Sequence, residues 1–168
     1  VDTSMGFTPV EGLLMGTRAG DLDLGVLTYL MEKEQIGYQS AAVLFNKHSG
    51  LLGVSGISSD MRDIEGAIAK GDAQAKLALD IYIYRIKKYI GAYIAALGGL
   101  DILVFTGGVG ENSDAVRESV CADLSYLGIE VDIEKNRGLK GEEALISKQE
   151  GKVKVIIVPT NEEYMIAL

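Results

Sequence analysis

The sequence contains, at residues 103–113, the run Leu-Val-Phe-Thr-Gly-Gly-Val-Gly-Glu-Asn-Ser, in which a short apolar stretch meets three glycines. The apolar stretch predicts a strand, and a helical pattern begins at Ser113. Glycine has no Cβ, so a ligand can approach the backbone closely. The start of a helix also offers free N–H groups and a partial positive charge. The run therefore indicates a nucleotide-sized ligand at Gly107, Gly108 and Gly110; the alternative is a tight turn that binds nothing.

This glycine run does not match either of the common phosphate-binding motifs. It is not a Walker A loop, because no Lys-Ser or Lys-Thr pair follows it. It is also a poor dinucleotide fingerprint, because Ser113 stands where the third glycine is required.

The composition excludes several classes of protein. The chain has 168 residues, enough for one domain with a core. Its net charge of −8 argues against a nucleic-acid surface, which needs clustered Lys and Arg. A single cysteine, Cys121, allows neither an internal disulfide nor a Cys-rich zinc site, and we expect it to be buried. The lone His48 is expected at the surface, near a helix end.

No segment of the sequence has the pattern of a membrane-spanning helix. The longest apolar helical pattern, 77–97, carries charged residues and is therefore amphipathic. The first residues lack the basic and apolar regions of a secretory signal, so we expect a cytoplasmic protein.

The predicted strands alternate with helices, which favours an α/β layer structure. Capping and periodicity predict helices at 25–34, 39–47, 61–70, 72–97 and 113–127, and strands at 101–106, 129–132 and 153–158. Gly50 is expected to end the second helix. Capping boxes at 8–11 and 160–163 predict two further helix starts. Residues 51–57 fit a strand, a bulged strand or a loop, and 135–149 an irregular surface segment.

Arg18 is a candidate for phosphate chemistry. It lies in the loop Gly16-Thr17-Arg18-Ala19-Gly20-Asp21-Leu22-Asp23, where flanking glycines leave it free to reach a substrate. Its guanidinium carries permanent charge and a planar donor fork suited to phosphate oxygens. The alternative is a surface arginine paired with Asp21 or Asp23, both of which are most simply helix caps.

Two acidic segments could serve a ligand or a helix. Glu162 and Glu163 follow a strand that ends in Val158-Pro159, where a carboxylate could hold Mg²⁺ through water. Acidic residues are equally favourable in a first helical turn, and Glu163 fits that capping role better. Asp60 and Arg62 could contact a nucleoside or could be a cap and a solvated arginine.

Several segments, in order, resemble the acetate kinase family: 2–9 running into 11–18, then 58–63, 105–113 and 159–163. The resemblance implies an ATP-dependent kinase that forms acyl phosphates. It implies the ribonuclease H-like fold of the actin, hexokinase and Hsp70 type, with two domains and nucleotide between them. Residues 1–168 would be a single C-terminal, nucleotide-side domain, a mixed sheet with several long helices, and the N-terminal domain would be absent.

The resemblance also implies roles for particular residues. Arg18 would stabilise the transferring phosphoryl group, and Glu162 would belong to the Mg²⁺ site. Asp60, Met61 and Arg62 would border the adenosine. The adenosine and phosphate side would be lined by Gly108, Val109, Gly110, Glu111 and Asn112. Family enzymes are homodimers through this domain, so we expect a homodimer.

The chain departs from the family pattern and leaves alternatives open. Leu24 stands where family members usually carry proline, and the His-Leu-Gly-Asn-Gly phosphate motif upstream of Val1 is missing. We therefore expect this chain alone to be inactive. Propionate kinase is the close competitor, because the acyl-pocket residues lie largely upstream. An oxidoreductase-type dinucleotide domain, with Asp132 downstream of the glycines, and a non-catalytic module that binds nucleotide or dimerises are the more distant alternatives.

Overall fold

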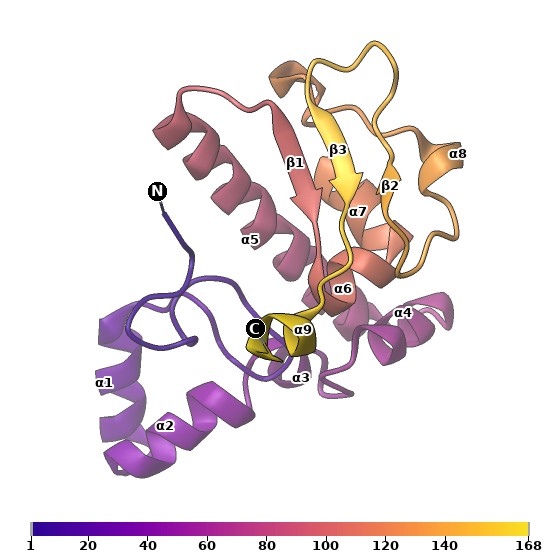
Figure 1. Ribbon diagram of the computed structural model, residues 1–168. Coiled ribbons are helices and arrows are strands. Elements are labelled where there is room, and N and C mark those ends of the chain that lie inside the picture. The colour runs from indigo at the N-terminus through magenta and orange to yellow at the C-terminus, as the bar shows by residue number, and fades with distance from the viewer. Residues whose placement is uncertain (1, 168) are drawn as a thin grey trace. The chain divides into compact units, whose positions relative to one another are not determined.

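The computed structural model describes residues 2–167, with the backbone alone at Glu162 (Figure 1). The chain divides into two compact units, one ending at Tyr89 and the other beginning at Ile90. Each unit brings together segments that are distant in the sequence.

The first unit is helical. It contains α1 (Leu24–Lys33), α2 (Tyr38–Lys47), α3 (Gly50–Ser55), α4 (Met61–Ala69) and most of α5 (Ala73–Leu97). Aspartate side chains cap three of these helices, accepting hydrogen bonds from the amides of Gly25, Arg62 and Ala75. The buried apolar residues of this unit are Leu14, Ala41, Leu51, Met61, Ile64, Ala75, Ala78 and Ile83.

The structure confirms four predicted helices here and corrects three expectations. Residues 51–57, expected as strand or loop, lie mostly in α3, where Gly50, Leu51 and Ser55 are buried at helical spacing. Gly50 begins α3 instead of ending α2. The capping box at 8–11 forms a turn with no helix after it, because Gly12 follows at a φ of 102° that a right-handed helix excludes.

The second unit is built on a small mixed sheet, whose strands lie side by side in the order β1–β3–β2, with α7 behind them in the view of Figure 1. β1 (Ile102–Phe105) pairs with β3 (Lys154–Ile157) in parallel, and β2 (Ala144–Leu145) pairs with β3 in the antiparallel direction. The helices are α6 (Gly107–Asn112), α7 (Asp114–Cys121), α8 (Ile133–Asn136) and α9 (Glu162–Ala167), with the 3₁₀ turn η1 at Ser125–Leu127. Val116, Val120, Ile146, Val155 and Ile157 are all buried.

The second unit also departs from the predictions in four places. The glycine run is itself a short helix, α6, and not a turn before one. The helix expected over 113–127 ends at Cys121, and Asp123, at a φ of 63°, separates it from η1. Residues 129–132, predicted to be a strand, form only isolated β-bridges. Residues 135–149, predicted to be irregular, contain the end of α8 and the strand β2.

Candidate active site

Arg18 lies on a loop, residues 12–21, that is tied to its surroundings through the backbone. The amides of Leu51 and Leu52, at the start of α3, donate to the carbonyls of Met15 and Gly16 at 2.9 Å. The first amides of a helix have no partner within the helix. The Arg18 loop supplies that partner, so the first turn of α3 and the loop fix each other in place.

Close contacts at glycines reinforce this attachment. A Cβ added to Gly50, which has a φ of 65°, would lie 2.2 Å from the carbonyl oxygen of Met15. One added to Gly20, at a φ of 76°, would lie 2.6 Å from the amide nitrogen of Leu14. These glycines allow close packing, which holds the backbone of the loop.

The Arg18 guanidinium keeps most of its donors available. It is half-buried, and one of its N–H groups donates to the sulfur of Met15 at 3.7 Å, a weak acceptor. Among the described side chains Arg18 makes no ion pair. Asp23 caps α1, whereas Asp21 is not a cap and instead bonds Gly12 and α5, which corrects its predicted role. The guanidinium is thus placed to accept an anion.

The Asp60 segment packs next to the Arg18 loop within the same unit. A Cβ on Gly16 would lie 2.8 Å from the carbonyl oxygen of Ser59. Asp60 caps α4 and pairs with the exposed guanidinium of Arg62, whose Nε lies 3.0 Å from Oδ1. Hydrogen bonds from Arg62 lower the pKa of Asp60 to about 2. Met61 is buried in the core, so Asp60 and Arg62 are the residues of this trio that solvent reaches.

In the second unit the three glycines of α6 have different surroundings. Nothing lies within 4 Å of a Cβ built on Gly107 or Gly108, so the backbone faces open space there. A Cβ on Gly110 would lie 3.4 Å from the carbonyl carbon of Phe105, so Gly110 packs against the end of β1. Asn112 donates to the carbonyl of Gly108 at 2.8 Å. The backbone open to a ligand is therefore that of Gly107 and Gly108.

Glu111 joins α6 to the segment that enters α9. Its Oε1 accepts hydrogen bonds from the amide of Thr160 at 2.8 Å, from the Thr160 hydroxyl at 2.9 Å and from the amide of Gly107 at 2.8 Å. These bonds, led by those from Thr160, lower the pKa of Glu111. The carboxamide of Asn161, and not Thr160, caps α9 by accepting from the amide of Tyr164. The side chain of Glu162, the predicted Mg²⁺ ligand, lies outside the described part of the structure.

Arg117 is a structural centre of this unit that the sequence analysis missed. It is fully buried, and its guanidinium donates to Gly110 O at 2.9 Å, Asn136 Oδ1 at 2.7 Å and Leu139 O at 3.0 Å. Burial lowers its pKa. Ser113, Arg117, Val120 and Cys121 follow helical spacing and are all buried, a pattern that could have revealed it. Cys121 and His48 are buried and exposed, respectively, as predicted.

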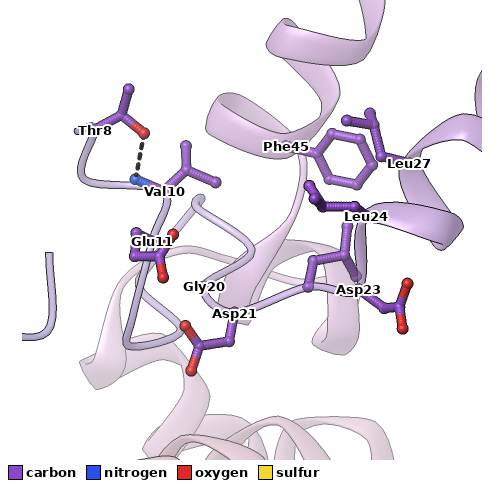
Figure 2. A pocket seen from close by; sticks show the side chains of 10 residues that line it. Thr8, Val10, Glu11, Gly20, Asp21, Asp23, Leu24, Leu27 and Phe45 are labelled. Atoms are coloured by element: carbon purple, nitrogen blue, oxygen red, sulfur yellow. Dashed lines mark hydrogen bonds between the residues drawn. The ribbon is translucent and has the colours of Figure 1, made fainter. Parts of the chain in front are cut away.

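A cavity of about 420 Å³ lies beside the Arg18 loop (Figure 2). Glu11, Asp21 and Asp23 line it together with apolar residues such as Leu27 and Phe45. Three carboxylates with no basic residue on its wall make it unsuitable for phosphate. Within residues 2–167, no group of three or more His, Cys, Asp or Glu side chains is arranged to hold a metal.

Comparison with known proteins gives consistent results. The profile of the Acetokinase family matches residues 1–168. The acetate kinase of Parabacteroides distasonis is 59% identical over 167 residues, covering 99% of this chain and 42% of that protein. The acetate kinase of Fervidobacterium nodosum is 59% identical over 169 residues, covering 99% and 41%. The chain thus spans about two fifths of the length of these relatives.

Solved structures agree with the sequences. The crystal structure of Porphyromonas gingivalis acetate kinase matches with a TM-score of 0.95 at 60% identity, over 98% of this chain and 41% of that one. A propionate kinase from Francisella tularensis matches with a TM-score of 0.91 at 40% identity, over 99% of this chain and 42% of that one.

Among the helices described here, none is both long and apolar enough to cross a bilayer.

Proposed function

Because this chain belongs to the acetokinase family, we propose that its full-length gene product transfers the γ-phosphoryl group of ATP to acetate, giving acetyl phosphate and ADP reversibly. The relatives at 56–60% identity are named acetate kinases. The propionate kinase structure is 40% identical. That difference favours acetate over propionate as the acceptor.

The observation that carries this proposal is the Arg18 guanidinium on its tethered loop, which makes no ion pair with the other described side chains. In the proposed reaction an acetate oxygen attacks the γ-phosphorus in line as the bond to the ADP oxygen breaks. Charge then spreads over the equatorial oxygens, and a fixed cation placed there stabilises the transition state. Arg18 is the cation that we assign to this role.

Asp60, Met61 and Arg62 would border the adenosine, with Asp60 and Arg62 exposed and Met61 beneath them. The α6 residues Gly108, Val109, Gly110, Glu111 and Asn112 would line the adenosine and phosphates. The open backbone at Gly107 and Gly108 suits close approach by a ligand.

We further propose that Glu162 holds Mg²⁺ with the nucleotide. Mg²⁺ is commonly bound by one or two carboxylates together with waters and substrate phosphates, so a single glutamate suits it chemically. Glu162 begins α9, two residues after Thr160, which Glu111 anchors to α6. When bound, Mg²⁺ would neutralise charge on the phosphate oxygens.

Residues 1–168 would be the C-terminal, nucleotide-side part of the kinase, which we place in the cytoplasm as a homodimer. Leu77 and Tyr84, seven residues apart on α5, are 47% and 62% exposed, which supports a protein contact there. Sedimentation of the full-length gene product should give a dimer mass, and Tyr84→Lys should shift it toward monomer. A monomeric wild type would contradict this assignment.

The test of the proposed activity is acetyl phosphate formation from acetate and Mg·ATP by the full-length gene product. We expect turnover with acetate and a lower kcat/KM with propionate. The 168-residue chain alone should show no turnover, because it covers only 42% of the length of a related acetate kinase. Failure to form either acyl phosphate would refute the kinase assignment, and preference for propionate would make it a propionate kinase.

A further inference from the structure

We infer that Asp21 is a positioning residue for Arg18, holding the 12–21 loop so that the guanidinium stays where phosphoryl transfer needs it. This inference rests on the proposed role of Arg18. Asp21 itself is assigned no contact with a reacting group and acts through the backbone of the loop.

Asp21 closes the loop on which Arg18 lies. Its amide donates to the carbonyl of Gly12 at 2.9 Å, and its Oδ1 accepts from the amide of Gly12, also at 2.9 Å. Residues 12 and 21 are therefore joined at both backbone groups of Gly12, with Arg18 between them. Gly12 has a φ of 102°, and a Cβ there would lie 2.2 Å from the Ser4 carbonyl oxygen, so this end of the loop has little room to shift.

Asp21 also fastens the closed loop to α5. The Tyr89 hydroxyl donates to both carboxylate oxygens, at 2.9 Å to Oδ2 and 3.1 Å to Oδ1. Arg85 donates to the Asp21 carbonyl at 2.7 Å and lies 3.7 Å from Oδ2. The Asp21 and Arg85 side chains are only 34% and 22% exposed, so these bonds are partly shielded from water. One aspartate thus links the Arg18 loop to a 25-residue helix.

Asp23 provides the contrast within the same loop region. It is two residues away and carries the same charge, but its carboxylate accepts from Gly25 at 2.6 Å and caps α1. Figure 2 shows the two carboxylates pointing apart. Removing the charge of Asp23 therefore affects a helix start and leaves the closure of the Arg18 loop intact.

Loss of the Asp21 contacts should reduce turnover more than nucleotide binding. A shift of about 1 Å in a group that meets the transition state costs on the order of 100-fold in rate. Asp21→Asn keeps the size of the side chain but removes the charge that faces Arg85 and one acceptor for Tyr89. We expect kcat to fall about 10- to 100-fold while the KM for ATP stays within about threefold.

A double-mutant cycle in the full-length gene product separates positioning from general stability. The variants are Asp21→Asn, Arg18→Ala, the double variant and Asp23→Asn as the matched control. If Asp21 acts through Arg18, the double variant has the kcat of Arg18→Ala, because the group being positioned is already gone. Asp23→Asn should keep the wild-type kcat. Tyr89→Phe, which removes one donor to Asp21, supplies a milder second test with a smaller fall in kcat.

The outcomes distinguish this inference from the function on which it rests. A wild type without acetyl phosphate formation, or an Arg18→Ala variant with normal kcat, would overturn both. An impaired Arg18→Ala variant beside normal Asp21→Asn and Tyr89→Phe variants would overturn the positioning role alone. Multiplied losses in the double variant would also overturn it, because they would show that Asp21 acts independently of Arg18.

Discussion

Glu111 and Thr160 are 49 residues apart in the sequence but are joined by two hydrogen bonds. One carboxylate oxygen of Glu111, Oε1, accepts from both the amide and the hydroxyl of Thr160. The amide of Gly107 donates to the same oxygen. The three neutral donors stabilise the ionised carboxylate, which joins the start of the glycine helix α6 to the segment that enters α9.

We predict that Glu111→Gln loosens this junction in a pH-dependent way. The pKa of Glu111 in the folded protein lies below its usual value of about 4.5, so its stabilising contribution is complete above that value. The contribution is lost as the pH falls through the lowered pKa. Hydrogen exchange at the amides of Gly107 and Thr160 should therefore be faster in Glu111→Gln than in wild type at pH 7, with the difference shrinking at acidic pH.

Glu118→Gln is the control for this experiment, because Glu118 is exposed on α7 in the same unit. Its exchange rates at Gly107 and Thr160 should equal those of the wild type. Equal exchange in Glu111→Gln and wild type at pH 7 would show that the Thr160 bonds do not hold the junction.

Gly50→Ala should destabilise the first unit and impair turnover. A non-glycine residue at a φ of 65° costs about 1–2 kcal/mol. The new Cβ would also lie 2.2 Å from the Met15 carbonyl oxygen, which must move with the Arg18 loop. We expect a total loss of about 3 kcal/mol or more in the free energy of unfolding, measured by denaturant titration, together with a lower kcat.

Gly56→Ala, at the other end of α3, is a close match for comparison. Its φ is 67°, but nothing lies within 4 Å of the position a Cβ would take. It should lose about 1–2 kcal/mol and keep its kcat. If both variants lost the same free energy of unfolding, the close contact between Gly50 and Met15 would not contribute to stability.

Arg117→Met should destabilise the second unit strongly. The substitution leaves the carbonyl oxygens of Gly110 and Leu139 and the carboxamide of Asn136 without their buried donor. Each such group costs about 1–3 kcal/mol, so a loss of about 3–5 kcal/mol is expected in denaturant titration. Arg137→Met removes an exposed arginine paired with Glu134 and should lose less than about 1 kcal/mol. Comparable losses would contradict the central position of Arg117.

The elements that the sequence predicted well are those fixed by local signals. Asp23, Asp60 and Asp72 each cap the helix that follows, and the bond runs to an amide two or three residues away. Such short-range chemistry is visible in the sequence itself. The same holds for β1 and β3, whose short apolar runs lie where strands were predicted.

The predictions that failed depended on distant partners. The local sequence predicts that Thr160 caps a helix. Its hydroxyl instead donates a hydrogen bond to Glu111, and Asn161 caps α9. Asp21 looks like a cap until its partners appear on α5, 64 and 68 residues further along the chain. The helix α3 was missed because its glycine-rich sequence is a poor helix former, and contacts with the Arg18 loop stabilise it instead. Tertiary contacts of this kind cannot be inferred from periodicity.

The role of Arg18 in phosphoryl transfer is tested most directly by the turnover of Arg18→Ala in the full-length gene product, with acetate and saturating Mg·ATP. We predict a kcat lower by about 10³- to 10⁵-fold, as for other arginines that stabilise a transferring phosphoryl group, with the KM for ATP changed much less. A variant that keeps near-normal kcat, or loses only ATP affinity, would show that the Arg18 guanidinium does not stabilise phosphoryl transfer.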